Sequence, residues 1–184
     1  MEKEIGLKKG FVRLEKYNPQ WQEEFNKEKE NLKNIFGDVA KSIEHVGSTS
    51  VVGLSAKPII DIAVGVDTLE DINKVKEKIL KFPHYTIKED NADGEILIRR
   101  GIPVKPGEIK PDFITHFIHI IEIDGVKYKD TIAFRDYLRA NKEVLKEYEN
   151  LKQKLANKFA KDRKAYSKAK HEFIESVQSK CDLN

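Results

Sequence analysis

The chain has 184 residues, of which 39% are hydrophobic and 35% are charged, and its net charge is +3. This balance is typical of a folded, water-soluble chain and excludes an intrinsically disordered one. The single cysteine excludes a disulfide framework within the chain, and no apolar run is long enough to span a membrane. Residues 1–10 lack the apolar core of a signal peptide, so the sequence predicts a cytoplasmic protein.

The first third of the chain predicts a helix followed by two strands. Residues 18–36 carry apolar residues near helical spacing, with Asn18 as the N-cap and Gly37 after the last turn. The second strand is apolar on both faces, which favours a central position in a sheet. The predicted strands are 40–46 and 57–66, and a turn rich in glycine and serine joins them at 47–56.

The middle of the chain predicts one helix and three further strands. Residues 68–82 are amphipathic, with Thr68 and Asp71 at the spacing of a capping box. The sequence "NADG", at 91–94, predicts a hairpin turn. Residues 101–111 contain three prolines and two glycines and predict a loop. The predicted strands are 84–90, 95–101 and 113–123.

The C-terminal part is predicted to be helical throughout, with breaks near Asn141 and Asp162 that give two or three helices. The expected fold class is α/β (α+β), with a mixed sheet of about five strands and flanking helices in residues 1–126. Residues 127–184 form a helical part that is expected to pack on this core as a single domain. They carry fifteen Lys or Arg and nine Asp or Glu, a local charge of +6 that favours a phosphate-bearing ligand or a solvated helix surface.

The turn at 47–56 has the composition of an anion-binding loop. Glycine allows a close backbone approach, and backbone N–H groups and hydroxyls in such a turn can hold a phosphate. Asp61 follows in the next strand, and a carboxylate beside a phosphate favours a Mg²⁺ ion between them. These residues together predict binding of a nucleoside triphosphate with Mg²⁺. The alternative for Asp61 is a structural role, pairing with Lys57 or an arginine.

The same motif resembles a known superfamily. Gly47 and Ser48 precede Asp61 by twelve intervening residues, as in the nucleotidyltransferases, and the stretch "HVGSTSVVGLSAKPIIDI" resembles the GrpB family in particular. The resemblance continues in "THFIHIIE", "AFRDYLRANKEVLKEYENLKQKLA" and "AYSKAKHEFIESV" and covers about 12–177. It implies a nucleotidyltransferase-like fold.

Carried over to this sequence, the resemblance implies a phosphate-gripping turn at Gly47 and Ser48 and a catalytic, metal-binding role for Asp61. The superfamily pattern has a second acid two residues further on, on the same strand face, where this chain has Ala63. Two-metal phosphoryl transfer needs several carboxylates, so another residue must replace this acid. The candidates are Glu44, Glu95, Asp112 and Glu122, of which Glu122 is placed with Asp61 in the expected metal site.

Further side chains are expected to contact the ligand. His116 and His119 point to opposite faces of a regular strand, and the resemblance places a family histidine at His119. One of Arg99 and Arg100 should face the ligand side, although surface ion pairing is the alternative for the arginines. A structural hydrogen bond is the alternative for each histidine. The complete set of expected ligand contacts is His45, Gly47, Ser48, Thr49, Ser50, Lys57, Arg99, His119 and Arg135.

The sequence thus predicts a GrpB-family nucleotidyltransferase that binds a nucleoside triphosphate with Mg²⁺ at Gly47–Ser50 and Asp61. Its acceptor is left open. The alternative, favoured by Ala63, is a protein of the same fold that binds a nucleotide or another phosphorylated ligand without catalysis. Nucleic-acid recognition is not indicated by any motif, and no membrane partner is expected.

Overall fold

A central sheet separates two groups of helices. The computed structural model describes residues 5–88, 94–105 and 108–181, with the side chains of 103–112 excepted. The strands are β1 (Leu7–Lys8), β2 (Ser42–Val46), β3 (Ile60–Val66), β4 (Tyr85–Lys88), β5 (Ile96–Lys105) and β6 (Glu108–Glu122). The α-helices are α1 (Gln20–Phe36), α2 (Lys76–Leu80), α3 (Val126–Ala140), α4 (Lys142–Lys158), α5 (Arg163–Ala169) and α6 (His171–Cys181). Short 3₁₀ turns cover Gly37–Val39, Ser48–Ser50 and Leu69–Lys74.

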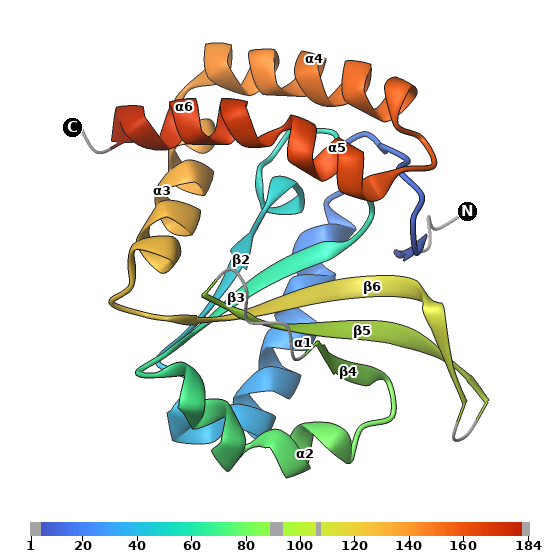
Figure 1. Ribbon diagram of the computed structural model, residues 1–184, viewed down its shortest axis with the longest axis vertical. Helices are drawn as coiled ribbons and strands as arrows, with labels where there is room; N and C mark the ends of the chain where they lie inside the picture. The colour runs from blue at the N-terminus through green and yellow to red at the C-terminus, as the bar shows by residue number, and fades with distance from the viewer. Residues whose placement is uncertain (1–4, 89–93, 106–107, 182–184) are drawn as a thin grey trace.

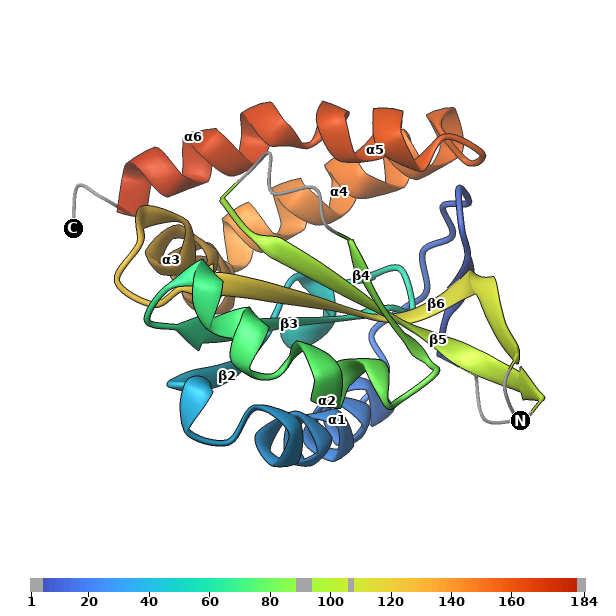
Figure 2. The ribbon, with the colours of Figure 1, turned by 60° about the horizontal axis from the view of Figure 1, so that its bottom comes forward.

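The sheet is mixed and has six strands. Its order is β2-β3-β6-β5-β4, and β1 pairs with β6 outside this path. Strands β3 and β6 run parallel, whereas the other pairs are antiparallel. Helices α1 and α2 cover one face, and α3 to α6 lie on the opposite side (Figure 1). Figure 2 shows the same three layers from another direction. The predicted mixed α/β fold class is confirmed.

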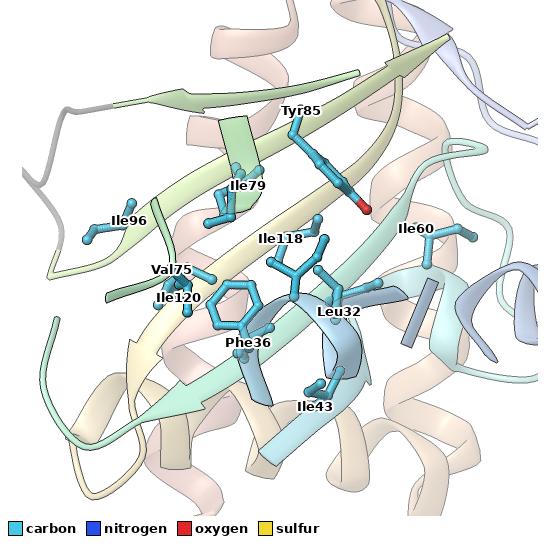
Figure 3. Packing of buried hydrophobic residues seen from close by; sticks show 14 of the residues in the cluster. Leu32, Phe36, Ile43, Ile60, Val75, Ile79, Tyr85, Ile96, Ile118 and Ile120 are labelled. Atoms are coloured by element: carbon cyan, nitrogen blue, oxygen red, sulfur yellow. The ribbon is translucent and has the colours of Figure 1, made fainter. Parts of the chain in front are cut away.

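The sheet face under α1 and α2 carries the main apolar core (Figure 3). Successive side chains of a strand point to opposite faces. Ile60, Ile62 and Val64 of β3 therefore reach this core together, beside Ile118 and Ile120 of β6. The helix side of the core consists of Trp21, Phe25, Leu32, Ile35 and Phe36. The same alternation turns Asp61 and Ala63 to the opposite face, under the C-terminal helices.

Helix α1 has the ends that the sequence predicts. The Asn18 side-chain oxygen accepts the N–H of Gln20 at 3.1 Å, and so satisfies one of the free donors of the first turn. Gly37, with φ of 53°, follows the last residue of the helix. This positive φ is easily adopted by glycine, which explains the stop.

The helix predicted at 68–82 is shorter and divided. The capping box of Thr68 and Asp71 is present, but it starts a 3₁₀ turn rather than an α-helix. The chain leaves helical geometry at Val75, whose φ is −121°, and whose side chain is buried in the main core. Only the five residues of α2 follow as α-helix.

The prediction of a loop at 101–111 is wrong, because strands β5 and β6 continue through most of this range. The pairing of the two strands is irregular there, with register shifts around Gly101 and between Pro103 and Lys105. Strand β4 ends its pairing with β5 at Arg100, so β5 is an edge strand beyond that point. Proline is tolerated at such edges and irregularities. The turn predicted at 91–94 falls almost entirely outside the described residues.

The C-terminal helices break where the sequence predicts. Helix α4 begins directly after Asn141, and Asp162 caps α5 by accepting the N–H of Ala165 at 3.0 Å. An additional break at Lys170 separates α5 from α6, so this part has four helices rather than two or three. In the described parts of the chain, no helix is long and apolar enough to cross a membrane.

Candidate functional site

The glycine-serine turn lies directly against Asp61. Val46, the last residue of β2, pairs with Asp61 of β3, and the turn begins at Gly47 with φ of 68°. A Cβ atom added to Gly47 would lie 2.5 Å from Oδ2 of Asp61. Glycine is therefore required both for the backbone conformation and for the close approach of the turn to the carboxylate.

Most polar groups of the turn form hydrogen bonds within the protein that fix the conformation of the turn. The Ser50 hydroxyl donates to the Gly47 carbonyl at 2.7 Å, and Arg139 donates to the Ser50 carbonyl at 2.9 Å. Thr49 Oγ1 lies 3.0 Å from Nε2 of His45. Ser48 differs, because its side chain lines a cavity and its hydroxyl has no hydrogen bond to any residue in the described ranges. Among the hydroxyls of Ser48, Thr49 and Ser50, that of Ser48 is the one available to a ligand.

His45 lies on the α1 face of the sheet, away from Asp61. Its ring stacks on Phe25 with a centroid distance of 4.7 Å, its Nδ1 faces Gln22 at 3.3 Å, and the residue is 4% exposed. Burial lowers the pKa of His45 to about 4, and the charges of Arg139 and Arg135 add to this effect. A neutral, buried ring supports Thr49 and has no charge to attract a phosphate. These contacts favour the structural alternative for His45, and its expected ligand role stays a prediction.

His119 links two carboxylates on the cavity face. Its Nε2 lies 3.7 Å from Oδ1 of Asp61, and its Nδ1 lies 3.2 Å from Oε2 of Glu95. Lys127 of α3 reaches the same Glu95 oxygen at 3.1 Å. Nδ1 is within hydrogen-bond distance of Glu95, and Nε2 is at ion-pair distance from Asp61. A protonated imidazole presents an N–H group to each carboxylate and is attracted to both. The geometry therefore favours a fixed imidazolium between Asp61 and Glu95.

The pKa values agree with a charged His119. Burial acts to lower the pKa of His119, but hydrogen bonds and charge from Asp61 and Glu95 outweigh burial and raise it to about 9. Burial likewise acts to raise the pKa of Glu95, but His119 and Lys127 bring it down to about 2. The pKa of Asp61 also lies below its usual value, because His119, Lys57 and Lys170 outweigh the effect of burial.

Ala63 occupies an apolar position, and among the residues that the structure describes no acid takes its place in space. It is fully buried in a cluster with Val46 and Ile121, against Tyr128 and Ile132 of α3. A carboxylate there would lose its hydration among apolar side chains. The second acid of the nucleotidyltransferase pattern is therefore replaced by a contact between the sheet and α3.

The proposed substitutes for the missing acid whose side chains are described do not join Asp61. Glu44 pairs with Arg135 at 2.8 Å. Glu122 pairs in register with Val66, five residues along β3 from Asp61, and accepts the N–H of Leu69 at 3.3 Å. The side chain of Asp112 lies outside the described residues. Glu95 approaches the site only from the other side of the His119 ring. The expected metal pair of Asp61 and Glu122 is not formed.

Arg135 links helix to sheet and does not face the ligand cavity. Its Nη1 donates to Glu44 at 2.8 Å and to the His45 carbonyl at 3.1 Å, while Nε donates to Asp136 at 2.8 Å. The residue is 9% exposed. These contacts use most of its donors and link α3 to β2, which favours the ion-pairing alternative for Arg135, while its expected ligand contact stays a prediction.

A cavity of about 360 Å³ opens on Asp61 and His119. The turn, the segment that leads into β3, and strands β3, β5 and β6 form one side of it, and the C-terminal helices contribute the other side. Among the described residues that line it, Asp61 is the only carboxylate. Besides His119, its cationic residues are Lys57, Lys152, Arg163 and Lys170. The cavity is therefore positively charged.

All four of these Lys and Arg side chains lie over aromatic rings, and the ammonium of Lys152 is 4.9 Å from the centroid of Tyr148. The ammonium groups of Lys57 and Lys170 lie 5.4 Å and 4.7 Å from the centroid of the Tyr166 ring. The guanidinium of Arg163 lies 4.3 Å from the centroid of Phe117. Burial, with the positive charges of Arg163, Lys170 and Lys152, lowers the pKa of Lys57 to about 7 against the opposing pull of Asp61. Lys57 thus occupies a site where its own charge is poorly compensated.

The two strand arginines point to opposite faces, as predicted. Arg100 faces α1 and contacts Glu28, with Nε 3.3 Å from the carboxylate. Arg99 alternates with it and pairs in register with Phe117, a cavity residue. Arg99 therefore lies on the cavity face, but it is not among the residues that line the cavity.

Arg163 and Tyr166 of α5, and Lys170 directly after it, were not given a site role from the sequence. They lie more than a hundred residues after Asp61. The signals that pointed to this region were the family-like stretch "AYSKAKHEFIESV", which contains Tyr166 and Lys170, and the local charge of +6 in residues 127–184. Lys152 of α4, which is 1% exposed, was not given a site role from the sequence either.

The donor set does not fit a two-metal centre. In the described portion of the chain, no cluster of three or more His, Cys, Asp or Glu is placed to hold a metal ion. Asp61 provides one carboxylate, and its Oδ1 faces the imidazolium of His119. A single Mg²⁺ needs only one or two protein carboxylates when phosphate oxygens supply other ligands. Asp61 therefore fits at most one ion that enters with its ligand.

Comparison with known proteins identifies the family. The family model described as GrpB protein matches residues 11–180. Glutamate-rich protein GrpB of Alkalihalophilus pseudofirmus is 37% identical over 174 residues, covering 94% of this chain and 97% of that protein. The UPF0157 protein YqkA of Bacillus subtilis is 35% identical over 88% of this chain and 45% of that longer protein. The crystal structure of conserved protein GrpB from Enterococcus faecalis has a TM-score of 0.78 and 32% identity, covering 92% of this chain and 96% of that one. The chain therefore belongs to the GrpB family.

Proposed function

We propose that this protein binds a small phosphorylated ligand, such as a nucleotide, in the cavity beside Asp61. The observation that carries the proposal is the charge of the cavity lining, which contains four Lys or Arg side chains, His119 and a single carboxylate. Phosphate is the common biological anion that such a site would attract.

The turn adds a second element of phosphate recognition. Gly47 brings the backbone against Asp61, and the Ser48 hydroxyl faces the cavity without a partner in the described part of the chain. Small residues of this kind permit backbone N–H groups to approach a phosphate closely. The cationic residues of α5 would then approach the ligand from the opposite side.

Thermal unfolding with added ligand tests this function. ATP, GTP, CTP, UTP and inorganic pyrophosphate are each added with and without Mg²⁺. A ligand at 100 times its dissociation constant should stabilise the folded state by about 2.7 kcal/mol. Ser48→Ala should weaken the effect, whereas Ser176→Ala, on the exposed surface of α6, should not. If none of these compounds raises the unfolding temperature, the proposed function is wrong.

Nucleotidyl transfer is a second candidate function, favoured by the contact between the turn and Asp61. In that reaction an acceptor hydroxyl oxygen bonds to the α-phosphorus while pyrophosphate leaves, and the hydroxyl proton passes to solvent. Mg²⁺ bound with the nucleotide would neutralise phosphate charge, and Asp61 would hold it. Pyrophosphate release that depends on Mg²⁺ and is lost in Asp61→Asn would support transfer. Nucleotide binding without release across a panel of acceptor alcohols would favour simple binding.

A further inference from the structure

Of the four Lys and Arg side chains that line the cavity, one has polar partners within the protein and three have none in the described residues. Lys152 donates to the carbonyl of Ser55, and its ammonium lies 3.9 Å from Glu149. In contrast, Lys57, Arg163 and Lys170 have no carboxylate at ion-pair distance within the described ranges. Their charged groups lie over the rings of Tyr166 and Phe117. Lys152 is thus a structural cation, and the other three remain free to meet an anion.

The arrangement of these three cations is unfavourable without an anion. Lys57 and Lys170 share one aromatic ring, and both lie within 5.4 Å of its centroid. Like charges repel strongly where water is partly excluded. A cation–π contact is attractive but small, about 0.5–2 kcal/mol. The charge on this side of the cavity is therefore compensated only in part by the protein.

We propose that Lys57, Arg163 and Lys170 bind a phosphate group of the ligand directly, without a divalent metal ion between phosphate and protein. This inference rests on the proposed function and specifies its ligand chemistry. The site takes a group with at least two negative charges, such as a phosphomonoester or a pyrophosphate. A phosphodiester, with one charge, would leave most of the positive charge uncompensated.

The position of His119 supports a metal-independent site. Its ring nitrogens face Asp61 and Glu95, so the carboxylate best placed to hold a metal is already paired with an imidazolium. A divalent ion added beside His119, Lys57 and Arg163 would increase a positive charge that is already in excess. In the proposed arrangement the side chains themselves neutralise the phosphate, and Asp61 keeps His119 charged.

Calorimetric titration of the full chain with inorganic pyrophosphate, AMP and ATP, in excess EDTA and in Mg²⁺, tests the inference. Binding should be retained in EDTA for all three compounds that carry a terminal phosphate. A cyclic phosphodiester, 3′,5′-cyclic AMP, should bind at least about ten-fold more weakly than AMP, because it cannot engage all three cations. If pyrophosphate binds and AMP and ATP do not, the ligand is an inorganic phosphate compound. If AMP and ATP bind more tightly than pyrophosphate, the ligand is a nucleotide.

A matched pair of variants at the end of α5 provides the control. Lys170→Met keeps the alkyl contact with Tyr166 but removes the charge, and should weaken pyrophosphate binding about ten-fold or more. Lys168→Met removes the same charge from an exposed position outside the cavity, and should change binding less than two-fold. The unfolding temperature of each variant establishes that it is folded.

The outcomes separate this inference from the function on which it rests. Binding that occurs only with Mg²⁺ would overturn metal-independent recognition while leaving phosphate binding intact, and would favour nucleotidyl transfer. Equal affinity of wild type and Lys170→Met in EDTA would also overturn the inference. No binding of any phosphate compound in either buffer would contradict both the inference and the proposed function.

Discussion

His116 and His119 lie three residues apart on β6, yet the two faces of the sheet give them opposite chemistry. On the α1 face, burial and the charge of Arg100 hold the pKa of His116 well below its usual value. On the cavity face, Asp61 and Glu95 raise the pKa of His119 to about 9. The same residue type is therefore neutral on one face and charged on the other.

The charges on the α1 face are compensated within the protein. Glu28, which is 2% exposed, accepts a hydrogen bond from Tyr85 at 2.7 Å and pairs with Arg100 at 3.3 Å. Asn31 donates to the same carboxylate at 3.2 Å. On the cavity face, Lys57, Arg163 and Lys170 lack such partners among the described residues. The difference indicates a structural network on one face and a ligand site on the other.

The largest expected effect is the loss of Glu28. Glu28→Ala leaves Arg100 without its buried counter-charge and Tyr85 without an acceptor, so the free energy of unfolding should fall by about 3 kcal/mol. Urea denaturation measures this change. Glu30→Ala, which removes an exposed pair with Lys33, should cost less than about 1 kcal/mol. Weaker pyrophosphate binding in Glu28→Ala, at a temperature where it is folded, would contradict the separation of the two faces.

The next effect should come from His119 and should depend on pH. Because its folded pKa of about 9 exceeds the ordinary 6.5, its charge stabilises the fold below pH 6.5, and this contribution is lost as pH rises to 9. His119→Gln should therefore lower the unfolding free energy by about 2 kcal/mol at pH 6 and by much less at pH 9. Urea denaturation at both pH values provides the test. His171→Gln, at an exposed position of α6, should change it by less than about 0.5 kcal/mol. A cost for His119→Gln that is independent of pH would exclude a stabilising imidazolium.

A smaller effect of opposite sign is expected for Lys57. Its folded pKa of about 7 lies below the ordinary 10.5, so its charge destabilises the fold at and below pH 7, and the cost disappears as pH rises toward 10.5. Lys57→Met should increase the unfolding free energy by about 1 kcal/mol at pH 7, allowing for solvent screening and the lost contact with Tyr166. The gain should be smaller at pH 9.5. Urea denaturation at the two pH values measures the difference. A variant that is less stable than wild type at pH 7 would contradict the claim that the charge of Lys57 is uncompensated.

The strand-turn-strand part of the site was predictable from local sequence. The apolar run placed Asp61 in the second, central strand, and the small residues marked the turn at Gly47. The position of His119 followed from the resemblance and from its spacing to His116. These features depend on neighbours within a few residues, so a single sequence contains them.

The remaining part depends on contacts distant in the sequence. Arg135 was expected at the ligand, but Glu44, 91 residues earlier, binds it. His45 is taken by Phe25 and Gln22 of α1. Arg163 and Lys170 enter the cavity only because α5 lies beside β3 and β6. The periodicity of a helix predicts which of its faces is apolar, but it does not predict which groups its polar side chains contact.

The central claim is that a phosphate compensates the cavity cations, and proton uptake on binding tests it most directly. Lys57 faces Asp61 of β3, Lys152 of α4, Arg163 and Tyr166 of α5, and Lys170 between α5 and α6. With a pKa of about 7 it is mostly neutral at pH 8, and an adjacent phosphate should raise that pKa. Calorimetric titration with pyrophosphate at pH 8, in two buffers of different ionisation enthalpy, measures the protons exchanged. The account predicts uptake approaching one proton by wild type and clearly less by Lys57→Met. Binding without proton uptake, or equal uptake by the two proteins, would contradict it.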